Sequence, residues 1–269
     1  EMLQWNYPYK KLSSVPVKIS VTELKRRFLQ EEQESAVPYV SPMVARPLFM
    51  ETEKGMSAAA KGTIMHFVMQ NIDLARLADV KKQQADRKEQ RLEAQQKANG
   101  QIRVQEDDPA QVAGYVNMLV EEIRAQIESM VADEKLTATE ADTINPEAIA
   151  AFFETPLGQR ILGAKNVRRE TAFNIEVNCS EIFADMAEEM YENETMLLQG
   201  VIDCWFESED GIVLLDYKTD YVPEGGEDII RKRYSVQIGY YAKALEKITG
   251  SRVTEKYLYL FDSGELVKY

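Results

Sequence analysis

Two carboxylates and a lysine stand in segments that otherwise have the composition of buried strands, in the stretch LQGVIDCWFESEDGIVLLDYKTD between Leu198 and Asp220. They are Asp203, Asp216 and Lys218. An ionised side chain is costly to bury unless it is paired with an opposite charge or bound to a metal. We therefore expect these three residues to serve chemistry rather than stability.

Strand geometry predicts how these side chains lie. Alternate residues of a strand share a face, so Asp216, Lys218 and Asp220 point one way and Tyr217 the other. The Asp-Gly pair at the end of SEDG is typical of a hairpin turn, which places Asp203 on the neighbouring strand. Counted back from that turn, the aspartates at 203 and 216 come near one end of the same ladder, within reach of one cation.

This set of residues suits phosphodiester hydrolysis. Mg²⁺ takes oxygen ligands, usually one or two protein carboxylates with waters and substrate phosphate. A lysine two residues beyond a ligand can orient an activated water and neutralise the charge that develops on a phosphate under attack. A pair of solvent-facing acids with a salt-bridged lysine would give the same D-x-K pattern, so the motif needs support from elsewhere.

Three further features give that support. His66 is the only histidine and stands in KGTIMH near the start of an expected helix, where it is a credible third metal ligand beside two acids. Glu170 in RRETAF either adds a carboxylate at the site rim or pairs with a neighbouring arginine. Gln237 and Tyr241, four residues apart on one helical face, either hold a DNA backbone or brace the site, although tyrosine at this spacing also suits a core.

Capping residues mark the start of two expected helices. Ser20 or Thr22 can cap a short helix in VKISVTELKRRF. Asn145 can cap a second one in NPEAIAAFFETPLGQRIL, with Pro146 at its first position.

Apolar spacing predicts buried-face helices at 57–78 and 109–133. Residues 81–108, rich in Gln, Lys and Glu, form an exposed helix or a flexible insertion. Three prolines predict an extended arm over 35–56.

The hydrophobic period changes from Arg168 onward. RRETAFNIEV, TMLLQGVIDCWFE and GIVLLDYKT alternate or are rich in β-forming residues, so three antiparallel strands are the simplest account. A helix follows in RYSVQIGYYAKALEKITG, closed by Gly250, and then a strand in EKYLYLFD. This order predicts an α/β core with a mixed sheet.

Composition and charge bound the class of protein. The 269 residues are 45% apolar and carry a net charge of −13, which argues against a free-standing nucleic-acid binder. If DNA is the partner, something else must hold it. Cys179 and Cys204 are too few for a disulfide framework or a four-cysteine metal site, and we interpret both as reduced thiols. No membrane span or secretory signal is expected, so the expected location is cytoplasmic.

Four motifs occur together in one order: G-x-x-x-H (Gly62, His66), G-x-x-D (Gly200, Asp203), D-Y-K (Asp216, Tyr217, Lys218) and Q-x-x-x-Y (Gln237, Tyr241). In this combination the chain resembles the RecB-family nucleases of the PD-(D/E)XK superfamily. The wording of GTIMHFVMQNI, LLQGVIDCWFE and DGIVLLDYKTD is most similar to the C-terminal nuclease domains of the AddA family of bacterial helicase-nuclease subunits. The resemblance covers most of the chain and is least specific over 81–108.

The resemblance implies a fold, a domain layout and a set of roles. The fold is an α/β, restriction-endonuclease-like core whose mixed sheet is flanked by helices. An N-terminal helix and arm, 1–56, pack on a nuclease domain, 57–269, with a helical insertion at about 79–165. The implied site residues are His66, Asp203, Asp216 and the backbone carbonyl of Tyr217 as ligands of Mg²⁺ or Mn²⁺, Lys218 as the catalytic lysine, Gln237 and Tyr241 as the accessory motif, and Glu170 as a less uniform acidic position.

The implied activity is metal-dependent exonuclease cleavage of DNA, in which attack by a metal-bound water leaves 5′-phosphate and 3′-hydroxyl ends. Such a domain trims the 3′-terminated strand delivered by attached helicase domains during double-strand break repair and recombination, beside an AddB-like partner subunit. Two alternatives are a non-catalytic assembly or DNA-guiding domain and a stand-alone phage-type exonuclease. The complete set of site residues counts against the first. The leading arm and the non-Met start, which suggest a longer parent chain, count against the second.

Overall fold

A six-stranded mixed sheet runs through the part of the chain that the computed structural model describes, residues 15–35, 56–99, 109–183, 193–220 and 226–269. Its strands are β1 (Lys18–Ser20), β2 (Val167–Asn178), β3 (Thr195–Ser208), β4 (Gly211–Lys218), β5 (Val253–Leu260) and β6 (Glu265–Lys268). The strand order is β1-β3-β4-β5-β6, and β2 pairs with the other edge of β3. The predicted α/β class with a mixed sheet is confirmed.

β3 is the strand on which the sheet is organised. It pairs antiparallel with β2 along nearly its whole length, antiparallel with β4 through a tight hairpin, and parallel with β1. β4 in turn pairs parallel with β5. The three predicted antiparallel strands are therefore confirmed. β1 and β6 were not predicted, because strands of three and four residues are too short to show an alternating pattern.

Helices lie on both faces of this sheet. They are α1 (Val21–Ser35), α2 (Ala58–Asn71), α3 (Leu74–Asn99), α4 (Pro109–Ala132), α5 (Ala138–Ala141), α6 (Pro146–Glu154), α7 (Pro156–Gly163), α8 (Cys179–Ile182) and α9 (Glu227–Thr249). No described helix combines the length and the apolar composition needed to cross a membrane. The extended arm expected over 35–56 lies almost entirely outside the described residues.

Three predicted helix ends are confirmed by their capping bonds. The Ser20 hydroxyl, rather than that of Thr22, accepts a hydrogen bond from the third residue of α1. The Asn145 side chain accepts one from Ala148, with proline at the first helical position. Gly250 closes α9 in the left-handed conformation, with φ 71°.

Two predicted helices are each divided in the structure. The helix expected over 57–78 ends near Asn71, and α3 begins after Asp73, whose carboxylate accepts hydrogen bonds from the next turn. The helix expected from Asn145 stops at Thr155, because a residue before proline is disfavoured in the helical region. Of the two alternatives for 81–108, the described part, up to residue 99, is helical.

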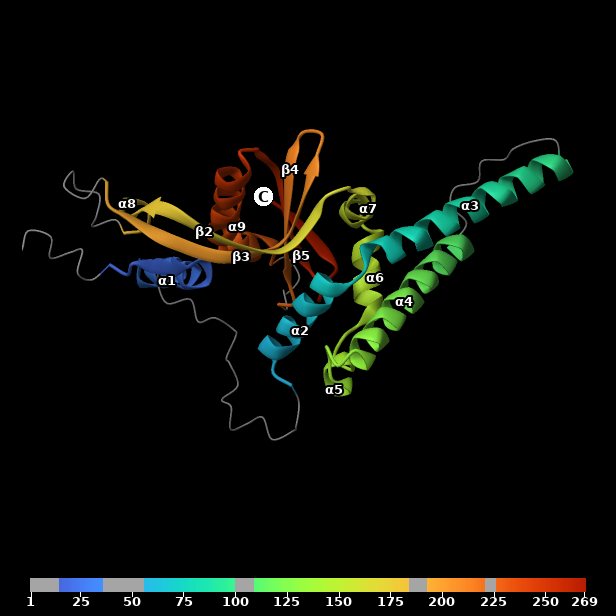
Figure 1. Ribbon diagram of the computed structural model, residues 1–269, viewed down its shortest axis with the longest axis horizontal. Helices are drawn as coiled ribbons and strands as arrows, with labels where there is room; N and C mark the ends of the chain where they lie inside the picture. The colour runs from blue at the N-terminus through green and yellow to red at the C-terminus, as the bar shows by residue number, and fades with distance from the viewer. Residues whose placement is uncertain (1–14, 36–55, 100–108, 184–192, 221–225) are drawn as a thin grey trace, which may run out of the picture.

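The sheet separates two hydrophobic cores (Figure 1). One lies under α1, α8 and α9 and includes Leu24 and Ile238. The other gathers α2 to α7 against the opposite side of the sheet and includes Val68, Leu119 and Phe152. The domain boundaries expected at 56/57 and the insertion expected at about 79–165 stay predictions.

β3 passes from one core to the other at Asp203. Leu198 and Ile202 belong to the core under α1 and α9, whereas Cys204 and Phe206 belong to the core of α2 to α7. All four have even numbers and would share one face of a flat strand. The ribbon of β2 and β3 must therefore twist sharply around residue 203, which makes this position the junction of the two cores.

Replacing Gly200 by Ala tests this packing. A Cβ at Gly200 would lie 2.8 Å from the ring of Phe173 and 3.2 Å from the side chain of Val21. We expect Gly200→Ala to destabilise the fold by about 1–3 kcal/mol in urea unfolding, because buried neighbours must shift. Gly239→Ala in α9, which would meet nothing within 4 Å, is the control and should stabilise by about 0.5–1 kcal/mol. Equal effects of the two variants would contradict this account.

Candidate active site

The hairpin ladder of β3 and β4 ends where the two aspartates meet. Its last pair is Cys204 with Leu215, so Asp203 and Asp216 are the next residues on the two strands. The backbone N–H of Tyr217 donates a hydrogen bond to Asp203 Oδ2 at 2.8 Å. The predicted meeting of the two acids at one end of the ladder is confirmed.

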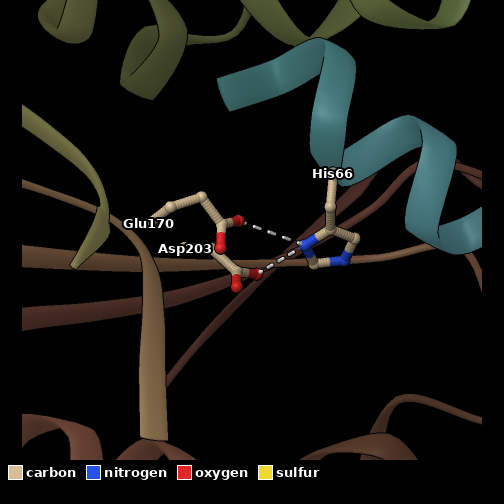
Figure 2. A group of neighbouring side chains, drawn as sticks. All are labelled: His66, Glu170 and Asp203. Carbon is tan, nitrogen blue, oxygen red and sulfur yellow. Dashed lines mark ion pairs between the residues drawn. The ribbon is translucent and has the colours of Figure 1, made fainter. Parts of the chain in front are cut away.

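His66 reaches the same point from α2 (Figure 2). Its Nδ1 lies 3.4 Å from Asp203 Oδ2 and 3.9 Å from Glu170 Oε1. One donor atom from each of these three residues lies within 4.8 Å of those of the other two. Gly62 allows this approach, because a Cβ there would lie 3.0 Å from Thr219 Oγ1 at the end of β4. The glycine and the histidine of G-x-x-x-H therefore serve one placement.

Glu170 holds its position with a strained backbone. It lies opposite Asp203 on β2, and its φ is 48°, a left-handed value that side chains other than glycine rarely adopt. Such a conformation costs about 1–3 kcal/mol and persists only where the surrounding structure enforces it. The pairing of β2 with β3 on both sides of Glu170 supplies that constraint and keeps the carboxylate beside His66.

A second group of site residues surrounds Asp216, which is fully buried. Its Oδ2 atom faces the ammonium of Lys218 at 2.5 Å in an ion pair whose geometry does not suit a hydrogen bond. Lys218 also donates to the carbonyl of Tyr217 at 3.0 Å. From α9, Gln237 Nε2 donates to Asp216 Oδ1 at 3.1 Å and to the Tyr241 hydroxyl at 3.0 Å. Of the two alternatives for Gln237, its contacts are those of a brace.

The expected metal ligands therefore fall into two neighbouring subsets. The clustered donor atoms are those of His66, Asp203 and Glu170. The other two expected donors, the carboxylate of Asp216 and the carbonyl of Tyr217, both face Lys218. The ring of Tyr217 points into the core of α2 to α7, on the opposite side of the strand from its neighbours, as the alternation predicts.

Burial and mutual repulsion separate the two aspartates electrostatically. Burial and the nearby charge of Asp203 raise the pKa of Asp216 to about 7. Burial also acts to raise the pKa of Asp203, but its interactions with His66 and Lys218 outweigh burial and lower it. Burial acts to lower the pKa of Lys218, and the attraction of Asp216 and Asp203 raises it. The site thus holds one carboxylate firmly ionised and another that resists ionisation.

His66 is a cation in this arrangement. Burial acts to lower its pKa, but hydrogen bonds to Asp203 and Glu170 and the charge of Asp203 together raise the pKa to about 10. The imidazolium therefore neutralises part of the negative charge of the cluster. A histidine binds a metal only after losing this proton, so metal binding and proton release are linked here.

Sequence patterns missed a third group next to Lys218. The Tyr234 hydroxyl donates to Asp220 Oδ2 at 2.6 Å, and the ammonium of Lys25 lies 4.1 Å from the centroid of the Tyr234 ring. Asp220 was expected on this face of the strand. No spacing in the sequence connects α1 with α9, so the position of Lys25 follows only from the packing of these two helices.

The donor set fits a hard divalent cation. One imidazole nitrogen and several carboxylate oxygens converge, and Asp216 Oδ2 is fully buried without a hydrogen bond from the described residues. Mg²⁺ and Mn²⁺ prefer oxygen ligands of this kind, and imidazole is compatible with several divalent metals.

An α/β sheet that gathers buried carboxylates and a lysine at the fork of a hairpin defines a class, and a sequence comparison agrees. The model of the PD-(D/E)XK nuclease superfamily matches residues 43–268, and the chain belongs to this superfamily. It is 43% identical over 270 residues to the ATP-dependent helicase/nuclease subunit (AddA) of Acetivibrio thermocellus and 41% identical over 263 residues to that of Clostridium novyi. The corresponding protein of Thermoanaerobacter pseudethanolicus is 40% identical over 269 residues. These matches take in 97–99% of this chain but only 18% of each relative.

We expect His66→Gln to change how stability depends on pH. His66 holds its proton more tightly in the folded state, so its contribution is complete below its unfolded pKa of 6.5 and is lost as the pH rises through about 10. In EDTA, the difference in unfolding free energy between wild type and His66→Gln should therefore be largest near pH 6 and shrink towards pH 10. Urea unfolding across this range measures it. A difference that does not change with pH would rule out the raised pKa.

Proposed function

We propose that this chain is a divalent-metal-dependent nuclease domain that hydrolyses phosphodiester bonds of a single DNA strand. The observation that carries the proposal is the buried Lys218 ammonium, 2.5 Å from Asp216 and 3.0 Å from the Tyr217 carbonyl, with Asp203 across the hairpin. A fold stabilised for its own sake gains little from such a group. Membership of a nuclease superfamily supports the same conclusion.

Each site residue receives a role in this proposal. His66, Asp203 and Asp216, with the Tyr217 carbonyl, would hold the metal, and Glu170 is placed to join them or to fix the imidazole. Mg²⁺ or Mn²⁺, when bound, supplies Lewis-acid activation of water and of the phosphate. Lys218 holds a proton and a positive charge beside the reacting phosphate. Gln237 fixes the carboxylate of Asp216, and Tyr241 fixes Gln237.

The wider role extends the proposal to the longer proteins that the chain matches. Their name, which describes subunits of an ATP-dependent helicase/nuclease, supports a nuclease attached to helicase domains and a partner subunit of the AddB type. Within such an assembly the domain would act as an exonuclease on the 3′-terminated strand in the cytoplasm, during double-strand break repair and recombination. The net charge of −13 is consistent with DNA that is held and delivered by other parts of the assembly.

Cleavage of end-labelled single-stranded DNA tests the activity. We expect degradation with Mg²⁺ or Mn²⁺ and none with EDTA. Asp216→Asn and Lys218→Met should each slow it by about a hundredfold or more, because each removes charge from where the transition state develops it. Asp86→Asn, an exposed change on α3, is the control and should cleave as the wild type does.

Two results would contradict the proposal. If no metal supports cleavage while the folded wild type also binds no metal, the non-catalytic assembly domain is the better account. Cleavage of circular single strands at the same rate as linear ones would exclude the exonuclease mode and keep the nuclease.

Titration with Mn²⁺ tests the metal site without relying on activity. Because the pKa of His66 is raised to about 10, binding at neutral pH should release a proton from the imidazole. Calorimetry in two buffers of different ionisation enthalpy measures that proton. Asp203→Asn should weaken binding and Asp86→Asn should not. Tight binding with no proton release would show that His66 is not a ligand.

A further inference from the structure

Helix α1 brings a lysine to the edge of the candidate site. The ammonium of Lys25 lies 4.1 Å from the centroid of the Tyr234 ring, and that of Lys218 lies 5.2 Å from the same centroid. Tyr234 in turn bonds Asp220, two residues beyond Lys218. The family match begins at residue 43, so Lys25 comes from a helix that precedes the matched segment.

Lys25 is a half-buried cation without a close counter-ion. Among the described residues, no carboxylate forms an ion pair with it. Asp216 and Asp220 attract it, but they are already engaged by Lys218 and Tyr234. Burial and the repulsion of Lys218 lower the pKa of Lys25. A desolvated ammonium that lacks a partner gains free energy when an anion binds beside it.

A second basic side chain stands next to Lys25. Arg233 precedes Tyr234 on α9, is half-buried, and repels the charge of Lys25. Other members of the basic triplets at 25–27 and 231–233 have different partners. Arg27 lies over the Phe183 ring, and Arg231 pairs with Glu227 at 2.6 Å. The packing of α1 against α9 therefore leaves Lys25 and Arg233 as a local positive spot in an acidic chain.

We propose that Lys25, with Arg233 beside it, binds a phosphate of the DNA strand next to the bond that is cut. This inference rests on the proposed nuclease function and adds a substrate contact from outside the matched family segment. A chain of net charge −13 repels DNA over most of its surface, so a spot of this kind determines where the strand lies. Lys25 positions the substrate, and Lys218 remains the lysine at the reacting phosphate.

The alternative is that Lys25 only attaches α1 to α9 through the Tyr234 ring. A cation–π contact of this kind contributes to stability and has no bearing on phosphates. Lys25→Met separates the two roles, because it keeps much of the aliphatic stem that packs between the helices and removes the charge. Arg26→Met is the matched control, since it removes one charge from the next, exposed position of the same helix.

Binding of fluorescein-labelled single-stranded DNA, measured by anisotropy in EDTA at several salt concentrations, tests the proposal. Lys25→Met should bind about tenfold more weakly than wild type, the effect of losing one hydrogen bond to a charged group. The slope of log affinity against log salt should fall by about 0.7, the value for one lost phosphate contact on a single strand. Arg26→Met should keep the wild-type slope, and Lys25→Arg should restore it. With Mg²⁺, the Lys25→Met change should raise KM more than it lowers kcat.

The outcomes also separate this inference from the nuclease proposal. A changed salt slope without cleavage by the wild type would sustain the phosphate contact and defeat the nuclease. Intact cleavage with an unchanged slope and a lower melting temperature would overturn the inference and leave Lys25 as an anchor. If Lys25→Met does not fold, Arg233→Gln takes its place, and an unchanged slope in that variant would also overturn the inference.

Discussion

The burial of Asp216 is the constraint on which the site depends. A carboxylate with no solvent exposure must be neutralised or bonded on every side, or its cost would exceed what a sheet of this size can bear. Lys218 supplies the opposite charge, and Gln237 supplies the amide bond. The position of α9 follows in part from this need, because Gln237 must reach the strand while Tyr241 fixes it from one turn away. A local charge problem thus connects β4 with the longest helix on its face.

The second constraint is the junction of two cores at Asp203. β3 can serve both cores only by twisting there, and Glu170 on the neighbouring strand accommodates the twist with a left-handed backbone. The polar groups of the site occupy the position where neither core closes over the sheet. His66 on α2, from one layer, and Gln237 on α9, from the other, can both reach this position. The site therefore uses a gap that the fold produces.

Local chemistry made much of this predictable from the sequence. The Asp-Gly turn, the alternation around Tyr217 and the spacing of Gln237 and Tyr241 are determined within a few residues, and each appears as expected. The break between α2 and α3 is not determined so locally. There the Gln126 side chain, 53 residues away, accepts a hydrogen bond from the backbone N–H of Asp73 and donates one to its carbonyl. A contact of this range leaves no periodic signal, and the same is true of Lys25.

Charge balance connects the inner and outer parts of the site. Inside, the imidazolium of His66 and the ammonium of Lys218 offset the carboxylates that face them. At the edge, the positive charge of Lys25 lies beside a tyrosine ring and is not offset by a close carboxylate. An anionic strand that approaches this acidic chain therefore meets attraction first at the edge, where α1 lies on α9. The inner cations are already engaged by protein groups, so they can act on a phosphate only after the strand has been aligned. This order of attraction, outer before inner, gives the N-terminal helix a part in the chemistry of strands more than a hundred residues away.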